Sequence, residues 1–381
     1  MNYGDYLRRM PAGSADLSRR RGLADRLHID LPLLALLLAL TAIGLVVLYS
    51  ASSQDMGSVM RQGRFFLIAY AVMLFVAQFD LERLKRLAPW GYLGGTALLV
   101  AVFFVGTHAK GAQRWLNIGG FQFQPSEIMK LMVPMAVAWY LSARILPPRF
   151  KHVLVALALI GVPTLLVAEQ PDLGTAILVA TAGCFVLFLA GLSWRYITAA
   201  VALLLAAIYP IWHFLLHDYQ RRRVLTLLDP EQDKLGAGWN IIQSKTAIGS
   251  GGFEGKGWLL GTQSHLDFLP EGHTDFIIAV LAEEWGLRGV IVLLAIYMAL
   301  IARGIWIATH AQHCFGRLLA GSVVLTFFVY VFVNMGMVAG LLPVVGVPLP
   351  LISQGGTALV TLLAGMGLLM AIATEKRILV Q

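Results

Sequence analysis

Hydrophobic residues in this chain are gathered into long runs that short polar segments separate. The first run covers residues 31–51, and nine more cover residues 65–79, 91–107, 126–144, 152–169, 174–192, 196–216, 276–302, 318–340 and 355–374. A transmembrane helix needs about 20 predominantly apolar residues, which is close to the length of these runs. The pattern therefore predicts an all-α polytopic integral membrane protein with about ten transmembrane helices.

Composition and charge support this class. Hydrophobic residues make up 58% of the chain and charged residues 13%, which is more apolar surface than a soluble fold can bury. The net charge of +8 does not indicate nucleic-acid binding, because the basic residues gather at the ends of the apolar runs. Two cysteines, Cys184 and Cys314, provide no disulfide framework.

The distribution of lysine and arginine predicts the orientation. Basic residues concentrate in residues 1–30 and in alternate connections, as expected for segments on the cytoplasmic side of a membrane. We therefore predict a bacterial inner-membrane protein with both termini in the cytoplasm. Residues 1–30 form the N-terminal tail, residues 31–375 a single transmembrane domain, and residues 376–381 the C-terminal tail.

One polar interval, residues 217–275, is much longer than the other connections. It contains tryptophan, phenylalanine and isoleucine residues that a disordered, highly charged segment lacks. We expect a folded extracytoplasmic cap between the seventh and eighth helices. Its glycine-rich stretch ends in Gly257, where an ATP-binding loop needs Ser or Thr, so the interval does not predict an ATP motor.

Two charged residues lie inside the fourth apolar run. Glu127 and Lys130 are three residues apart on one helical face, close enough to pair, and Ser126 is predicted to cap the helix. An ionisable pair within a span marks a site that faces the protein interior or an aqueous cavity, and a structural salt bridge between helices is the alternative. Lys110 and Arg114, in the preceding loop, suit an anionic phospholipid head or an interfacial anchor.

Further polar residues stand where apolar runs begin or end. Asp172 either caps the following helix or places a carboxylate at the mouth of a cavity. Arg221, Arg222 and Arg223 open the long interval, and arginine forks bind phosphate and pyrophosphate through two hydrogen bonds. Attachment of the interval to anionic lipid is the alternative for these three arginines.

The long interval ends in a second acidic cluster. Asp275 stands at the change from polar to apolar sequence, where capping the eighth helix is its simplest role. Glu271 and His273 come just before it, at a membrane–water boundary where partial desolvation raises the pKa of a carboxylate. Asp275 is therefore also a candidate general base.

Two features have mainly structural interpretations. Glu283, Glu284 and Arg288 form a polar cluster in the eighth run, with Glu284 and Arg288 spaced to pair on a helix. Residues 334–358 contain three prolines and repeated glycines, which predicts a non-helical, re-entrant segment whose backbone protein or water must shield. Amides near Ser353 are available to bind an anionic or sugar ligand.

Several long motifs follow one another in a single order. They are QPSEIMK at 124–130, QPDLGT at 170–175, DYQRRRV at 218–224, GTQSHLDFLPEGHTDF at 261–276 and the tract at 334–358. Together they resemble the SEDS family (shape, elongation, division and sporulation), in particular its elongation-type branch, over essentially the whole chain from about residue 31. One departure is Gln354, where the family usually has Tyr, Ser or Ala.

The resemblance implies a function and a site. It implies a peptidoglycan glycosyltransferase that polymerises lipid II, alongside a class B penicillin-binding protein and other membrane proteins of the elongation complex. It also implies that Asp275 is the family's essential aspartate, and that Glu127 and Lys130 are its glutamate–lysine pair.

The implied reaction needs little beyond one base. A carboxylate removes the proton from the acceptor hydroxyl, and displacement of undecaprenyl pyrophosphate inverts the donor sugar from α to β. No firm cofactor is predicted, and a divalent cation, Mg²⁺ or Mn²⁺, is expected only as one held jointly with pyrophosphate. The alternatives are a lipid II flippase, with Glu127, Lys130 and Asp172 along its route, and a non-catalytic scaffold.

Overall fold

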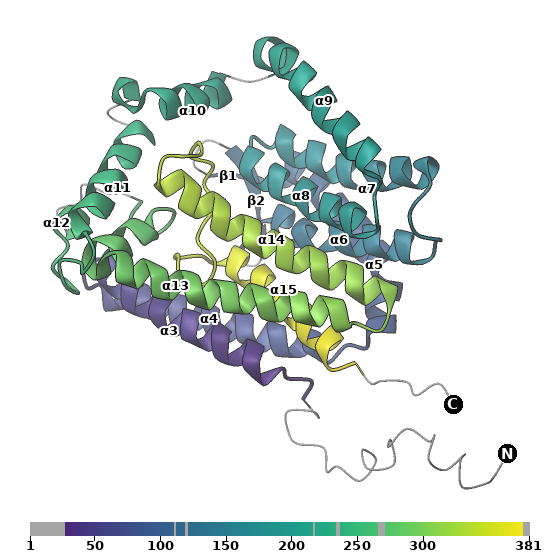
Figure 1. Cartoon of the computed structure of the whole chain (residues 1–381), viewed down its shortest axis with the longest axis horizontal. Helices are drawn as coiled ribbons and strands as arrows, with labels where there is room; N and C mark the ends of the chain where they lie inside the picture. Colours follow the sequence, from purple (N-terminus) through teal and green to yellow (C-terminus); the bar gives the residue numbers. More distant parts are fainter. Residues whose placement is uncertain are drawn as a thin grey trace, which may run out of the picture.

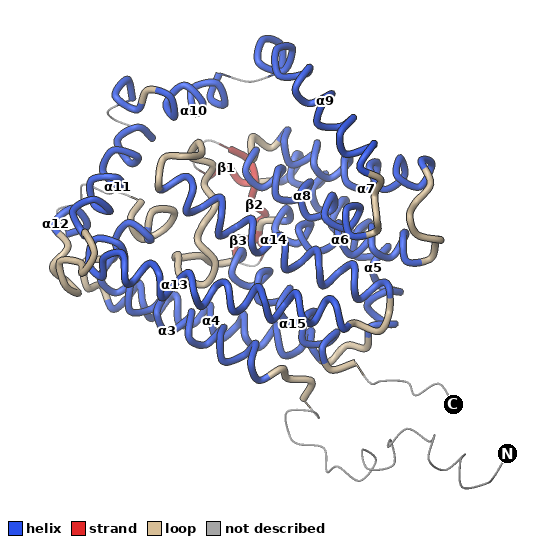
Figure 2. The backbone as a smooth tube through the Cα atoms, viewed as in Figure 1, coloured by secondary structure: helices blue, strands red, loops and turns tan. Residues whose placement is uncertain are grey.

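The computed structural model describes residues 27–109, 112–118, 121–215, 218–233, 237–265 and 271–375. The long helices are α3 (Leu31–Ala51), α4 (Met56–Ala77), α5 (Leu81–Val105), α6 (Pro125–Ser142), α7 (Phe150–Glu169), α8 (Leu173–Leu189), α9 (Trp194–Pro210), α13 (Ile277–His310), α14 (Cys314–Val338) and α15 (Thr357–Ala373). Each overlaps one predicted run, and helices dominate the chain in Figures 1 and 2. The all-α polytopic fold is therefore confirmed.

The number of spans stays a prediction. Within the described residues, seven helices are long and apolar enough to cross a membrane, and α8 and α15 are apolar but shorter. The remaining long helix, α6, carries Glu127 and Lys130. Residues 1–26 and 376–381 lie outside the described part of the chain, so the two cytoplasmic tails also stay predictions.

Two helices begin well before the apolar runs that predicted them. The Asp55 carboxylate accepts hydrogen bonds of 2.9 Å from the backbone N–H groups of Gly57 and Ser58, and this cap starts α4 at Met56. Likewise α5 starts at Leu81, directly after Asp80. Hydropathy does not distinguish a polar helical turn from a loop, so the sequence placed both starts too late.

A small antiparallel sheet lies between α5 and α6, where the sequence predicted only a loop. Its strands are β1 (Thr107–Ala109), β2 (Ala112–Ile118) and β3 (Phe121–Phe123), in the order β1-β2-β3. Strands this short contain too few alternations to predict a sheet. The sheet carries Arg114 and Trp115 toward the helices.

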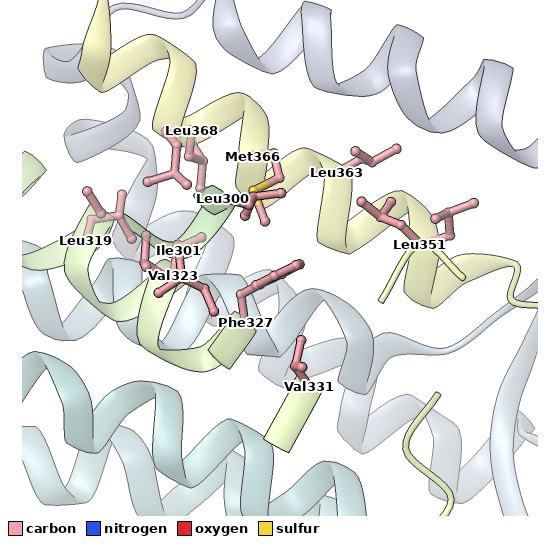
Figure 3. Packing of buried hydrophobic residues seen from close by; sticks show 14 of the residues in the cluster. Leu300, Ile301, Leu319, Val323, Phe327, Val331, Leu351, Leu363, Met366 and Leu368 are labelled. Carbon is pink, nitrogen blue, oxygen red and sulfur yellow. The ribbon is translucent and has the colours of Figure 1, made fainter. Parts of the chain in front are cut away.

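The core joins consecutive helices and also helices that are far apart in the sequence. α15 packs on α4, α13 packs on α14 and α3, and α6 packs on α5 and α8. Figure 3 shows part of this packing, in which α13, α14 and α15 contribute Leu300, Ile301, Leu319, Val323, Phe327, Val331, Leu363, Met366 and Leu368. This shared core fixes the ends of α13 and α14 relative to each other.

The interval 217–275 is helical over much of its described length. It contains α10 (Asp218–Leu228), a 3₁₀ helix η3 (Pro230–Asp233), α11 (Ala237–Gly251) and the single turn α12 (Thr262–His265). In Figure 1, α9 and α10 run along the upper margin, and α11 returns to α13. The Ser244 hydroxyl of α11 donates a 3.0 Å hydrogen bond to the carbonyl of Val338.

A glycine-rich turn after α11 forms backbone hydrogen bonds with α13 at a kink in that helix. Gly286 has a φ of 67°, and the backbone N–H groups of Lys256 and Gly257 donate to the carbonyls of Glu283 and Glu284 at 3.0 and 2.9 Å. Lys256 also pairs with the fully buried Glu283 carboxylate at 2.7 Å. Glu283 is therefore structural, as predicted, whereas the kink at Gly286 interrupts the helical spacing assumed for the pairing of Glu284 with Arg288.

The segment between α14 and α15 is non-helical, as predicted. Residues 347, 349 and 351–353 are buried, and the Tyr297 hydroxyl donates a 2.6 Å hydrogen bond to the carbonyl of Pro350. Protein atoms therefore shield much of this irregular backbone, as a segment at membrane depth requires.

Candidate functional site

A cavity of about 550 Å³ lies at one end of the bundle, where distant segments meet. Its charged lining consists of Arg114, Glu127, Lys130, Asp172, Arg223, Glu271 and Asp275, all of them predicted site residues. They come from β2, α6, the turn before α8, α10 and the turn before α13. The volume falls within the roughly 300–1,000 Å³ of small-molecule sites in proteins.

The glutamate–lysine pair is formed at the start of α6. The Lys130 ammonium lies 2.6 Å from Glu127 Oε1, and each side chain is only 7% exposed. The predicted cap is wrong, because α6 starts at Pro125 with Gln124 as its N-cap residue, which places Ser126 inside the first turn. Because the pair is buried beside the cavity, it fixes one positive and one negative group in the cavity wall.

Asp172 fulfils both of its predicted roles. Its Oδ1 accepts from the backbone N–H of Thr175 at 3.3 Å and caps α8. Its Oδ2 accepts a 2.8 Å hydrogen bond from Gln124 Nε2 and lies 3.8 Å from the guanidinium of Arg114. Arg114 also donates from Nε to the carbonyl of Gln170 at 3.2 Å, so β2 is tied to the turn before α8.

Asp275 lies in the turn just before α13 and is not its cap. The N-cap residue is Phe276, and no side chain caps the helix there. Asn334 of α14, which is fully buried, donates from Nδ2 to the carbonyls of Asp275 and Val347 at 2.9 and 2.8 Å. A Cβ atom added to Gly346 would lie 3.7 Å from Asp275 Oδ2, so the carboxylate faces a glycine in the cavity wall.

Ser353 and His273 do not line the cavity. The Ser353 hydroxyl donates to the carbonyl of Thr274 at 2.6 Å and accepts from the backbone N–H of Leu349 at 2.8 Å. The carbonyl of His273 accepts a 3.1 Å hydrogen bond from the N–H of Gln354. Ser353 therefore holds two backbone segments together, and ligand binding by this residue stays a prediction. Neighbouring Gln354 lines the cavity.

The side chains of Arg221, Arg222 and Arg223 point in different directions because they lie on the helix α10. Successive residues on an α-helix point about 100° apart. Accordingly Arg223 lines the cavity, Arg222 is exposed, and Arg221 donates a 2.9 Å hydrogen bond to the carbonyl of His213. The structure thus brings one of the three arginines, Arg223, to the cavity wall, and phosphate binding by the three stays a prediction. Lys110 lies outside the described residues.

The comparisons with known proteins agree on one family. The family model of the FtsW, RodA and SpoVE cell cycle proteins matches residues 31–378. The chain belongs to this family. It is 56% identical over 355 residues to the peptidoglycan glycosyltransferase MrdB of Escherichia coli (strain K12), an alignment that covers 93% of this chain and 96% of MrdB.

Solved structures of family members share the fold. One is a chain from a study of how a peptidoglycan synthase complex coordinates polymerization and crosslinking, with 33% identity, a TM-score of 0.80 and coverage of 90% of this chain and 97% of that one. Another is the rod shape determining protein RodA of Thermus thermophilus, with 30% identity, a TM-score of 0.69 and coverage of 91% and 97%.

Three residues of the site were not singled out from the sequence, although Gln124 and Asn334 open two of the motifs quoted above. Tyr330 of α14 lines the cavity, and its ring centroid lies 5.0 Å from the Lys130 ammonium, a distance typical of a cation–π contact. Asn334 and Gln124 hold Asp275 and Asp172 through the hydrogen bonds described above. Each contact joins segments far apart in the chain, so periodicity and spacing do not predict it.

A metal site made by a protein requires several His, Cys, Asp or Glu side chains that converge on one ion. Among the described residues, no three His, Cys, Asp or Glu side chains converge on one point. Glu127 and Asp172 already face the cations Lys130 and Arg114. In the described part of the chain, both carboxylates are therefore engaged in ion pairs and not directed at a shared point.

Proposed function

We propose that this chain is a peptidoglycan glycosyltransferase that polymerises lipid II for cell elongation and rod shape. The observation that carries the proposal is the meeting of the Asp275 carboxylate with Lys130, Arg114 and Arg223 in one cavity. A base and several cations are what sugar transfer from a pyrophosphate requires. The identity with the peptidoglycan glycosyltransferase MrdB supports the same activity.

In the proposed reaction, Asp275 is the general base. It accepts the proton of the acceptor sugar's 4-hydroxyl as that oxygen attacks the anomeric carbon of the donor. The new C–O bond forms on the face opposite the breaking bond, and undecaprenyl pyrophosphate leaves with the bonding electrons. A single displacement converts the α-linked donor into a β-1,4-linked product.

The leaving pyrophosphate needs positive charge rather than a proton. Lys130, Arg114 and Arg223 line the same cavity as Asp275 and are the proposed partners of the pyrophosphate oxygens. Glu127 and Asp172 hold Lys130 and Arg114 in place by ion pairing. A divalent cation, Mg²⁺ or Mn²⁺, would be held jointly by substrate oxygens and a cavity carboxylate and would add charge at the leaving group.

The proposed setting is the bacterial inner membrane. With both termini in the cytoplasm, the turn before α13 and its cavity face the extracytoplasmic side, where the sugars of lipid II are exposed. A class B penicillin-binding protein is the proposed partner, supported by the likeness to a chain of a peptidoglycan synthase complex.

The flippase alternative has less support from the geometry. A route for a headgroup across the membrane would place charged residues at successive depths. The carboxylates of the cavity instead come from the first turn of α6 and from the turns just before α8 and α13. This clustering at one end of the bundle favours chemistry at one membrane face.

The test measures glycan strands made from purified lipid II by the full chain with its penicillin-binding partner, whose transpeptidase site is inactivated. Asp275→Asn is expected to lower the rate by about 10²–10⁴-fold, the usual contribution of a general base. Asp80→Asn is the matched control, because Asp80 is exposed and lies before α5 in a surface ion pair. A folded D275N variant that polymerises at the wild-type rate refutes the role of Asp275, and wild type that makes no strands refutes the activity.

A further inference from the structure

A second cavity, of about 350 Å³, lies on the α3 and α13 side of the molecule. It is lined almost entirely by apolar atoms of Ile43, Leu281, Trp285, Gly289, Val292 and Leu293, together with Arg288. None of these residues lines the cavity of Asp275. We refer to it as the α3–α13 groove.

The α3–α13 groove faces the lipid phase. Both helices are among those long and apolar enough to cross a membrane. Trp285 and Val292 are 42% and 56% exposed, so their apolar surface lies open on a spanning helix. In a bilayer, hydrocarbon chains are the natural cover for such a surface.

Arg288 gives the groove one charged end. The side chain is exposed, and among the described residues it makes no ion pair with a carboxylate of the protein. An arginine on the lipid-facing side of a span extends its side chain toward the headgroups, where its guanidinium pairs with an anionic group.

Neighbouring aromatic residues place this end near the outer headgroups. The backbone N–H of Arg288 donates to the carbonyl of Phe253 at 3.3 Å. Close by, the Trp258 ring lies 6.2 Å from the ring of Tyr49 at the end of α3. Phe253 and Trp258 are 66% and 48% exposed, as is typical of aromatic residues at a membrane interface.

We propose that the α3–α13 groove is a binding site for an anionic glycerophospholipid of the outer leaflet. One acyl chain lies against Ile43, Gly289 and Val292, and the phosphate pairs with Arg288. The occupant is not the reacting substrate, because no residue that lines the α3–α13 groove also lines the cavity of Asp275. The site is additional to the proposed glycosyltransferase function and does not depend on it.

The test is native mass spectrometry of the full-length protein with an equimolar mixture of phosphatidylglycerol and phosphatidylcholine that carry identical chains. Wild type is expected to retain phosphatidylglycerol about fivefold more than phosphatidylcholine at low salt, the ratio expected for one basic residue at a membrane surface. Arg288→Gln is expected to remove the preference. Val292→Trp, which fills the groove, is expected to reduce retention of both lipids. Arg149→Gln, at an exposed arginine before α7, is the matched control and keeps the wild-type preference.

Two results overturn the proposal, provided that the variants keep the wild-type melting temperature. One is equal retention of the two lipids by wild type, and the other is an unchanged preference in R288Q. If V292W does not fold, R288Q alone decides, because Arg288 is exposed and its substitution leaves the apolar wall intact. A second mixture also contains undecaprenyl phosphate. If this lipid displaces phosphatidylglycerol from wild type but not from R288Q, the choice of a glycerophospholipid as the occupant is refuted.

Discussion

Asn334 is expected to control activity without touching the substrate, because its side chain holds the backbone of Asp275. Its amide donates to the carbonyls of Asp275 and Val347 and so joins the turn before α13 to the segment after α14. Asn334→Leu keeps a similar volume and removes both hydrogen bonds. Each bond contributes about 0.5–1.5 kcal/mol net, so the loss is about 1–3 kcal/mol, concentrated at the proposed base.

The expected result is a selective loss of rate. A displacement of about 1 Å of a catalytic group costs about 10²-fold, so N334L is expected to polymerise lipid II about 10–100-fold more slowly than wild type. Because the cations of the cavity are unchanged, lipid II binding is expected to stay within a few-fold of wild type. The assay is the strand-synthesis measurement described above, combined with a lipid II binding titration.

Ser322→Ala is the matched control for this prediction. Ser322 is also fully buried in α14, and its hydroxyl donates a 2.7 Å hydrogen bond to the carbonyl of Ala182, away from the cavity. S322A is expected to lower the melting temperature with little change in rate per folded molecule. Equal loss of rate in both variants, or full activity in N334L, refutes the positioning role of Asn334.

Substitutions of Tyr330 and Gly255, each paired with a control variant, test the geometry further. Tyr330→Phe is expected to keep most of the activity, whereas Tyr330→Leu removes the aromatic face beside Lys130, worth about 0.5–2 kcal/mol, and raises KM by about 2–30-fold with a smaller change in kcat. Equal KM values for the two variants contradict a role for the ring. Gly255→Ala is expected to lower the melting temperature, because its Cβ would lie 2.2 Å from the carbonyl oxygen of Glu284 and its φ is +82°. Gly249→Ala, in α11 with open space around the added methyl group, is the control, and equal melting temperatures refute the close-contact argument.

The sequence by itself determined the helices and the contacts within them. In a bilayer, backbone polar groups must be satisfied internally, so each apolar run of spanning length has to become a helix. Residues three apart on a helix share a face, so the Glu127–Lys130 pair followed from spacing alone. The cap by Asp172 also followed, because its partner Thr175 lies three residues away.

Only the tertiary structure decided which distant residues meet. Asn334 reaches Asp275 across 59 positions, and Gln124 reaches Asp172 across 48. The buried carboxylate of Glu283 pairs with Lys256 of the glycine-rich turn. Such contacts depend on how helices pack against one another. The apolar pattern of a single helix does not predict which polar side chain of a neighbouring helix will lie beside it.

The same limit explains two details that the sequence did not resolve. Arg221, Arg222 and Arg223 are adjacent in sequence, but the rotation of α10 directs only Arg223 into the cavity wall. Asp275 stands where a cap belongs, yet α13 begins one residue later and the carboxylate lines the cavity. Sequence patterns thus located both groups in segments that meet at the cavity, while helix rotation and the packing of α13 against α14 decided where each side chain points.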